Sequence, residues 1–185
     1  MLKNIWEFLK IILISLVIIL PIRYFIIQPF YVKGASMEPN FHDREYLIID
    51  EISYRFNEPQ RGQVIVFRYP DNPQEYFIKR VIGLPGETVS MINGEIYISN
   101  SSNPEGFKLD ESTYLTNNVK TYAIDEEPVI LGANEYFVLG DNRYASKDSR
   151  TFGSLNDSFI TGKVLLRAWP FSTFSLFNYD NIYNN

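Results

Sequence analysis

The chain has 185 residues and a formal net charge of -5, and it contains no cysteine. The missing cysteines exclude zinc ribbons, thiol proteases and disulfide frameworks, and the acidic balance, with no basic face, argues against nucleic acid as a partner. The hydrophobic fraction of 45% and the aromatic fraction of 16%, with 13 Tyr and 14 Phe, predict a mostly β body.

An apolar stretch at residues 5–27 predicts a transmembrane helix that anchors the chain. From Trp6 to Arg23 such a helix would extend about 27 Å, close to the hydrocarbon thickness of a bilayer. Lys3 and Lys10 favour an N-terminus on the cytoplasmic side. The predicted organisation is a cytoplasmic N-terminus at 1–4, a transmembrane anchor at 5–27 and an extracytoplasmic domain at 28–185.

Two other interpretations of this stretch are a removable signal peptide and a buried core helix. A signal peptide needs small residues soon after its apolar run, but Pro21 and Arg23 follow here. Val32 and Gly34 could form a cleavage pair, although they lie too far from the apolar run. Pro21 also makes a buried helix awkward, so an uncleaved anchor is the favoured interpretation.

After residue 29 the pattern changes to alternating residues and short apolar runs, which predict strands. A hairpin is predicted at residues 88–98, because Asn93-Gly94 favours the two-residue turn of a hairpin. We expect no helix outside the anchor. The other predicted strands cover residues 64–69, 76–82, 136–139 and 160–169.

Two segments lack a clear periodicity. Residues 99–128 are polar and rich in Ser, Asn and Glu, which indicates a variable excursion from the core or a small β-lobe. The tail, residues 170–185, begins with an aromatic and apolar run. This run could pack on the body or contact the membrane, and the pattern does not separate the two possibilities.

The candidate nucleophile is Ser36, which stands between Gly34 and Pro39 just after the predicted anchor. A Ser-His-Asp triad would need the single histidine, His42, oriented by a carboxylate. Asp43 is adjacent, but neighbouring residues in a chain point apart, so a solvated turn histidine is favoured. One histidine and scattered carboxylates give no support to a metal site.

Lys79 is the alternative base for Ser36. It lies in the apolar run 76–82, so its strand is expected to be buried. The ordinary lysine pKa near 10.4 would have to fall by about three units, or about 4 kcal/mol, for the amine to accept a proton at neutral pH. Desolvation can produce that shift, whereas a lysine on the polar face of a strand would stay charged.

A third polar stretch, 140–150, follows the strand predicted at 136–139. Its hydrogen-bonding side chains suit a supporting shell around a site. The competing interpretation is a hydrophilic turn with surface ion pairs of little energetic value. The polar residues are Asp141, Asn142, Arg143, Ser146, Asp148, Ser149 and Arg150.

Together these stretches resemble the type I signal peptidases, in the single-span form of Gram-positive bacteria. The matching motifs stand in the family's order and cover nearly the whole chain, and residues 99–128 are the least constrained part. The resemblance implies a β-rich Ser-Lys peptidase domain behind one transmembrane helix. The motifs are Gly34–Pro39 with Phe41, Arg61–Phe67, Tyr76–Glu87, and Gly140–Arg150 with Phe152 and Gly153.

By this resemblance Ser36 is the nucleophile and Lys79 the general base, and the reaction passes through an acyl-enzyme. Ser146 matches the residue whose hydroxyl holds the lysine amine in place. Two ion pairs that brace the family's site are also matched. They are Asp148 with Arg150 and Asp141 with Arg80.

Two positions depart from the family pattern. Some relatives have a serine two residues before the nucleophile, and its hydroxyl supports the oxyanion hole. Here that residue is Gly34, so the backbone amide of Ser36 would have to act with another donor. The loss of one such donor can cost ~3 kcal/mol. Asn40 replaces the usual Thr or Ala, with no predicted consequence.

The family cleaves after small residues, as in Ala-x-Ala, because shallow apolar pockets exclude larger side chains. The resemblance therefore implies signal-peptide-bearing preproteins as substrates and a lipid bilayer that holds enzyme and substrate together. It also implies a monomer that needs neither cofactor nor metal. The expected pocket residues are Val32, Met37, Phe77 and Ile78.

Three other functions compete with this hypothesis. A catalytically silent relative that serves as a membrane-bound chaperone would be expected to lack Ser36 or Lys79, and both are present. A self-cleaving Ser-Lys repressor should carry a DNA-binding domain in place of the anchor. A specialised peptidase that serves one substrate stays open.

Overall fold

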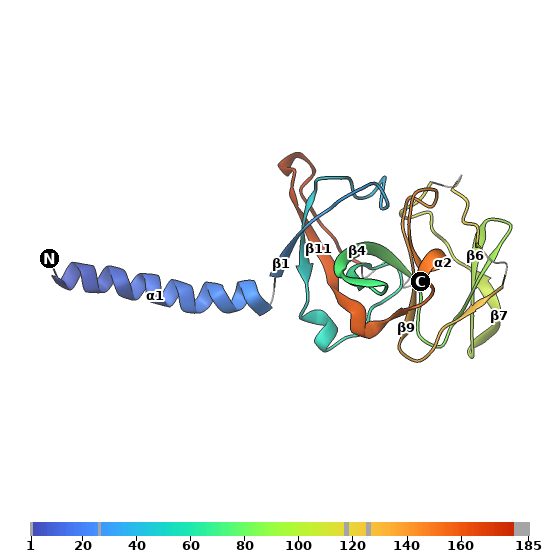
Figure 1. Ribbon diagram of the computed structural model, residues 1–185, viewed down its shortest axis with the longest axis horizontal. Coiled ribbons are helices and arrows are strands. Elements are labelled where there is room, and N and C mark those ends of the chain that lie inside the picture. The colour runs from blue at the N-terminus through green and yellow to red at the C-terminus, as the bar shows by residue number, and fades with distance from the viewer. Residues whose placement is uncertain (1, 26, 117–118, 125–126, 180–185) are drawn as a thin grey trace.

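The computed structural model describes residues 2–25, 27–116, 119–124 and 127–179. A long N-terminal helix, α1 (Leu2–Phe25), projects away from a body built on two antiparallel sheets (Figure 1). Parts of four predicted segments, the N-terminus, the anchor, the excursion and the tail, lie outside the described residues. These parts are residues 1, 26, 117–118, 125–126 and 180–185.

Helix α1 ends at Phe25, and Ile27 already belongs to strand β1 (Ile27–Tyr31), so the helix stops two residues before the predicted end of the anchor. Large apolar side chains on α1 are exposed, among them Leu13 at 63% and Val17 at 64%. Within the described part of the chain, no helix is both long enough and apolar enough to cross a membrane.

The larger sheet contains eight strands in the described residues, in the order β1-β2-β11-β3-β4-β9-β10, with β12 paired to β11. Strand β3 lies between β11 and β4, and its near-complete burial on both faces explains the continuous apolar run at 64–67. The strands are β2 (Tyr46–Asp50), β3 (Val64–Tyr69), β4 (Asn72–Gly83), β9 (Glu135–Leu139), β10 (Leu155–Asn156), β11 (Ile160–Trp169) and β12 (Ser175–Leu176).

The smaller sheet has the order β7-β6-β5-β8. The predicted hairpin is confirmed, because Asn93 and Gly94 turn the chain with φ values of 54° and 80°, the left-handed conformation that this turn requires. Residues 99–128, predicted as an excursion, supply β7 and a packed irregular stretch after it. The strands are β5 (Thr88–Ile92), β6 (Glu95–Asn100), β7 (Asn103–Lys108) and β8 (Val129–Ile130).

The predicted strands at 64–69, 76–82, 136–139 and 160–169 are confirmed. The expectation of no helix outside the anchor is wrong, because α2 (Ser149–Phe152) forms one turn. Its N-cap is Asp148, whose carboxylate accepts a hydrogen bond from the backbone amide of Arg150. Short 3-10 turns also occur at η1 (Ser53–Arg55), η2 (Asp157–Phe159) and η3 (Phe171–Thr173).

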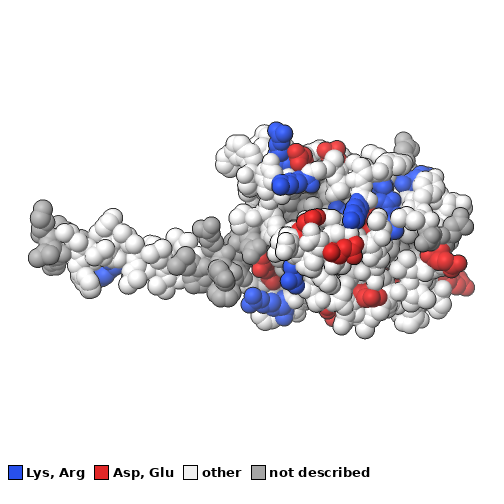
Figure 2. All heavy atoms as spheres, in the orientation of Figure 1, with Lys and Arg blue, Asp and Glu red and all other residues white. Residues whose placement is uncertain are grey.

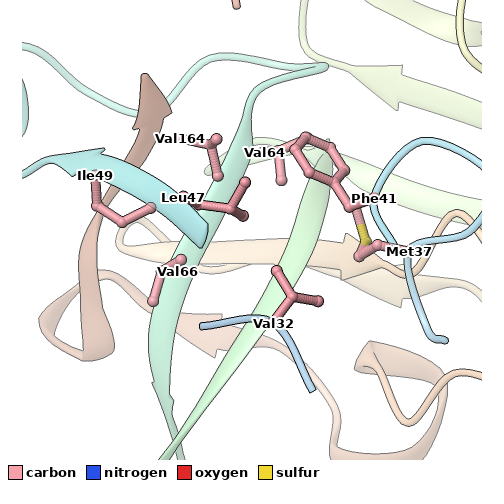
Figure 3. Close-up of a cluster of buried hydrophobic side chains, with 8 residues drawn as sticks. All are labelled: Val32, Met37, Phe41, Leu47, Ile49, Val64, Val66 and Val164. Carbon is pink, nitrogen blue, oxygen red and sulfur yellow. The ribbon is translucent and has the colours of Figure 1, made fainter. Parts of the chain in front are cut away.

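One hydrophobic cluster joins the loop after β1 to the larger sheet (Figure 3). Met37 and Phe41 are each 1% exposed, and they meet side chains from β2, β3 and β11. This packing fixes the loop that carries Ser36 on a rigid support. The buried members are Val32, Met37, Phe41, Leu47, Ile49, Val64, Val66 and Val164.

The described part of the tail packs on the body. The Phe177 ring lies 4.9 Å from the Phe41 ring, and the Tyr179 hydroxyl donates a hydrogen bond of 3.1 Å to the Val164 carbonyl. Phe171 and Phe174 point the other way and are 75% and 60% exposed. The inner side chains of the tail therefore belong to the core beneath the Ser36 loop.

Charged side chains of both signs are interspersed over the visible face of the body, whereas α1 shows few (Figure 2). Several of the strongest ion pairs are buried. The side chains of Arg80 and Asp141, for example, are 5% and 0% exposed. These buried pairs surround the end of β4, where the candidate site lies.

Candidate active site

Ser36 lies in a loop between β1 and β2 whose ends are held together by backbone hydrogen bonds. The Val32 amide donates to the Glu45 carbonyl at 2.9 Å, and the Arg44 amide donates to the Val32 carbonyl at 3.0 Å. Inside the loop, Gly34 has a φ of 86° and its amide donates to the Asp43 carboxylate at 2.8 Å. The turn before the serine is thus fixed by a side chain nine residues away.

Lys79 approaches Ser36 from β4. Its Nζ lies 2.8 Å from the Ser36 Oγ and 2.8 Å from the Ile78 carbonyl oxygen. The lysine is 3% exposed. Burial lowers its pKa from 10.5 to about 8, although the negative charges of Asp148 and Asp141 oppose that shift. The neutral amine, which can accept a proton, is therefore accessible near neutral pH.

The next residue on β4, Arg80, forms a buried ion pair with Asp141. Its Nε and Nη2 donate to the two carboxylate oxygens at 2.8 and 2.6 Å, and its Nη1 donates to the Gly62 carbonyl at 2.8 Å. The Tyr114 ring lies under the guanidinium, 4.1 Å from its carbon. Every face of this cation is occupied, as a buried charge requires.

The second predicted pair, Asp148 with Arg150, is also present. Arg150 donates through Nε and Nη2 to the two carboxylate oxygens of Asp148, at 2.8 Å each. Asp148 Oδ2 also accepts from the Gly140 amide at 3.0 Å. The carboxylate therefore closes the loop 140–150 on itself and caps α2.

Gly140 is the point where this loop meets the serine. A Cβ at this residue would lie 2.1 Å from the Ser146 Oγ and 2.4 Å from the Ser36 carbonyl oxygen, so the contact needs a residue without a side chain. The Asn142 amide donates to the Ser36 carbonyl at 3.1 Å, and its side chain donates to the Ala35 carbonyl at 3.1 Å.

The hydrogen bond expected from Ser146 to the lysine amine is not formed. The Ser146 Oγ is buried and has no hydrogen-bond partner among the described residues. The amine instead bonds to Ser36 and to a backbone carbonyl on its own strand. Ser146 still faces the site, since it touches the Gly140 position from the side opposite to Asp148 Oδ2's amide contact.

The two departures from the family pattern have different surroundings. Around Gly34 there is open space for a Cβ, but the positive φ disfavours any other residue. Asn40 is integrated into the site, because its side-chain nitrogen donates to Asp141 Oδ2 at 2.9 Å and to the Tyr114 carbonyl at 2.7 Å. Asn40 thus ties the serine loop to the buried ion pair.

His42 takes no part in this arrangement. Its side chain is 56% exposed, and its Nδ1 lies 3.8 Å from a Glu38 carboxylate oxygen. The base that contacts the Ser36 hydroxyl is Lys79. The exposed position matches the interpretation of His42 as a solvated turn residue.

A cleft of about 550 Å³ opens beside Ser36 and Lys79, between the end of β1 and the outer half of β4. Three of the four expected pocket residues, Val32, Phe77 and Ile78, line it. Met37 does not, because it is buried in the cluster beneath the loop. The lining residues are Phe30–Lys33, Ser36, Leu47, Val66, Gln74–Lys79 and Lys147.

Three contributors to the site were missed by the sequence analysis: Glu111, Tyr114 and the backbone-binding side chain of Asn142. Glu111 and Tyr114 stand in the polar segment 99–128, far from any motif. The buried residues Leu109 and Leu115 on either side are the only local signal that this stretch packs on the body. Asn142 was noted only as one polar residue of its loop.

A serine hydroxyl in contact with a buried, low-pKa amine at the edge of a cleft is the arrangement expected of a hydrolase with a serine nucleophile. Comparison with known proteins agrees. The family model described as "Signal peptidase, peptidase S26" matches residues 5–169. The chain therefore belongs to the signal peptidase family, peptidase S26, and is a serine peptidase of the signal peptidase I type.

Individual relatives cover most of the chain. Signal peptidase IB of Staphylococcus aureus strain MRSA252 is 34% identical over 194 aligned residues, covering 98% of this chain and 99% of the relative. A Synechocystis protein named "Probable signal peptidase I-2" is 34% identical over 174 residues, covering 91% and 75%. A crystal structure of a signal peptidase I from Enterococcus faecalis V583 shares 32% identity, covers 58% of this chain and 97% of that chain, and has a TM-score of 0.46.

Proposed function

We propose that the chain cleaves signal peptides from preproteins with Ser36 as the nucleophile and Lys79 as the general base. The observation that carries this proposal is the 2.8 Å contact between the Lys79 Nζ and the Ser36 Oγ, together with the burial of the lysine. A desolvated amine at this distance can take the serine proton as the hydroxyl attacks a carbonyl.

The proposed reaction has two stages. In the first, Lys79 accepts the proton of Ser36, Oγ bonds to the scissile carbonyl carbon, and the lysine returns the proton to the departing amine of the mature protein. In the second, the neutral lysine takes a proton from water, which attacks the acyl-enzyme and releases the signal peptide. The Ser36 amide is the proposed oxyanion donor, with a second donor in place of the missing side chain at Gly34.

The proposed substrates carry small residues at the first and third positions before the cut, as in Ala-x-Ala. Val32, Phe77 and Ile78 support this specificity, because an apolar lining beside Ser36 favours small side chains and excludes larger ones by overlap. Neither a cofactor nor a metal has a role in this mechanism, and the proposed active unit is a monomer.

We propose that α1 anchors the enzyme in the membrane, with residues 1–4 in the cytoplasm and 28–185 outside. Exposed apolar side chains such as Leu13 and Val17 support an apolar environment around the helix. Full-length protein should float with phospholipid vesicles, and the variant Leu13→Asp with Val17→Asp should not. Equal flotation of both proteins would contradict the anchor.

The test of the reaction is cleavage of a model preprotein by the purified full-length chain in detergent, with the mass of the new N-terminus as readout. Ser36→Ala and Lys79→Ala should each lower kcat/KM by at least about 1,000-fold while the protein stays folded. The matched controls, Ser102→Ala and His42→Ala, change exposed residues and should stay within twofold. Wild-type turnover by Lys79→Ala, or a loss confined to His42→Ala, would remove the proposed base.

A further inference from the structure

A short segment of the smaller lobe reaches the loop that faces Ser36. We call residues 109–116 the strap. It has no regular secondary structure, but Leu109 and Leu115 are 3% and 7% exposed, and the Leu109 amide donates to the Ile96 carbonyl at 2.8 Å. The strap is therefore fixed on the smaller sheet, and its polar residue Glu111 points to the candidate site.

Glu111 binds the guanidinium of Arg143 with both carboxylate oxygens, at 3.0 and 2.5 Å. The Arg143 side chain is fully buried, and its Nη1 also donates to the Thr121 hydroxyl. Because a buried cation needs an opposite charge, Glu111 is the group that makes this position of Arg143 favourable. A bidentate contact also fixes the orientation of the guanidinium plane.

Arg143 passes this orientation to the loop at Ser36. Its Nε donates to the Gly140 carbonyl at 3.0 Å. Gly140 lies directly against Ser36 and Ser146, and the next residue but one, Asn142, holds the Ser36 carbonyl. A shift of Arg143 would therefore move the two residues of the loop that touch the backbone of the nucleophile.

A second contact of the strap reinforces the first. The Tyr114 hydroxyl donates to Glu111 Oε1 at 2.7 Å, and the Tyr114 ring lies under Arg80. The Tyr114 carbonyl accepts from the Asn40 side chain. The strap thus contacts the serine loop, the lysine strand and the loop 140–150 through one small group of side chains.

We propose that Glu111 is a positioning residue for the peptidase reaction, acting through Arg143 on the Gly140 contact with Ser36. The inference rests on the proposed function, in which Ser36 and Lys79 are the reacting pair. Glu111 does not touch the substrate cleft: in the described structure, no strap residue is among those that line it. Loss of Glu111 should therefore change kcat and leave KM nearly unchanged.

The test compares Glu111→Gln with Asp110→Asn in the full-length enzyme. Both variants remove one carboxylate from adjacent residues, but Asp110 is exposed and its carboxylate accepts from the Ser112 amide. Glu111→Gln should lower kcat at least tenfold with KM within twofold of wild type, whereas Asp110→Asn should stay within twofold in both. Glu111→Asp keeps the charge and should lose less than threefold.

A double-variant cycle separates positioning from general stability. If Glu111 acts through Arg143, the double variant Glu111→Gln with Arg143→Gln should have the same kcat as Arg143→Gln alone. Equal kcat values for Glu111→Gln and Asp110→Asn would overturn the proposal, and so would a change in KM alone or additive losses in the cycle. If Glu111→Gln does not fold, failure of Glu111→Asp to retain activity while folded would overturn it as well.

The same assay distinguishes this inference from the proposed function. An inactive Ser36→Ala beside a fully active Glu111→Gln would overturn only the positioning role. Full activity of Ser36→Ala would instead remove the nucleophile on which both rest.

Discussion

The environment of Lys79 combines two opposing influences on one amine. Burial lowers its pKa to about 8, while the carboxylates of Asp148 and Asp141 act in the opposite direction. Both carboxylates are neutralised by arginines, Arg150 and Arg80, that bind them through two hydrogen bonds each. The two ion pairs therefore do more than brace the loop, because they limit the negative charge that would keep the lysine protonated.

The first prediction concerns the dependence of activity on pH. Since the free enzyme needs a neutral lysine, kcat/KM for preprotein cleavage should rise about tenfold per pH unit below a midpoint near 8 and level off above it. The profile of the His42→Ala variant should have the same midpoint. A midpoint near 10, or one that disappears in His42→Ala, would contradict the assignment of Lys79.

The sequence allowed Ser36, Lys79 and both ion pairs to be chosen, because each lies in a short motif with few competitors. It could not reveal Glu111 and Tyr114, whose contacts depend on how a polar segment folds back across the body. It also led to an expected bond from Ser146 to the lysine that is not formed. Hydroxyl contacts of that kind depend on a rotation about one side-chain bond, which motif spacing does not determine.

At the scale of elements, the tail has a role in the support of the serine loop. Strand β12 pairs with β11, and the Phe177 amide donates to the Leu165 carbonyl at 2.9 Å. The Arg167 guanidinium lies 5.4 Å from the Phe41 ring and 5.7 Å from the Phe177 ring. The family model ends at residue 169, so this support lies beyond the part that it matches.

The second prediction follows from the two faces of the tail. Phe177→Ala should lower the free energy of unfolding by roughly 2–4 kcal/mol, because it removes a ring from a packed cluster. Phe174→Ala removes an exposed ring and should change stability by less than about 0.5 kcal/mol. Urea unfolding in detergent measures both, and equal effects of the two variants would show that the tail does not pack as described.

Strand recognition depended on how each strand is stabilised. β3 and β11 have long apolar or alternating runs of their own and were found from the sequence. β1 was hidden because it continues the apolar run of α1 without a break, and β10 and β12 have two residues each. Such short strands exist only through pairing with a longer neighbour, so their own residues carry no periodic signal.

At the scale of the whole molecule, the candidate site lies where three parts of the chain meet. The larger sheet supplies Lys79 on β4, the loop after β1 supplies Ser36, and the strap of the smaller lobe supplies Glu111. The arrangement keeps the outer half of β4 clear for the cleft. Changes in the smaller lobe should therefore reach the reaction through buried contacts and not through substrate binding.

The burial of Lys79 also has a consequence for the stability of the protein. With a pKa of about 8 when folded and 10.5 ordinarily, the lysine binds more protons in the unfolded state between these pH values, so stability should increase with pH across this window. Below pH 8 the full difference opposes folding, by about 3 kcal/mol.

Replacing the lysine should therefore make the protein more stable while it abolishes activity. At pH 7, Lys79→Met should raise the free energy of unfolding by up to about 3 kcal/mol, and the gain should shrink as the pH approaches 10. Urea unfolding at pH 7 and pH 10 provides the comparison, and a less stable variant at pH 7 would contradict it. In this enzyme the group that activates the serine would then also be the residue that most weakens the fold at neutral pH.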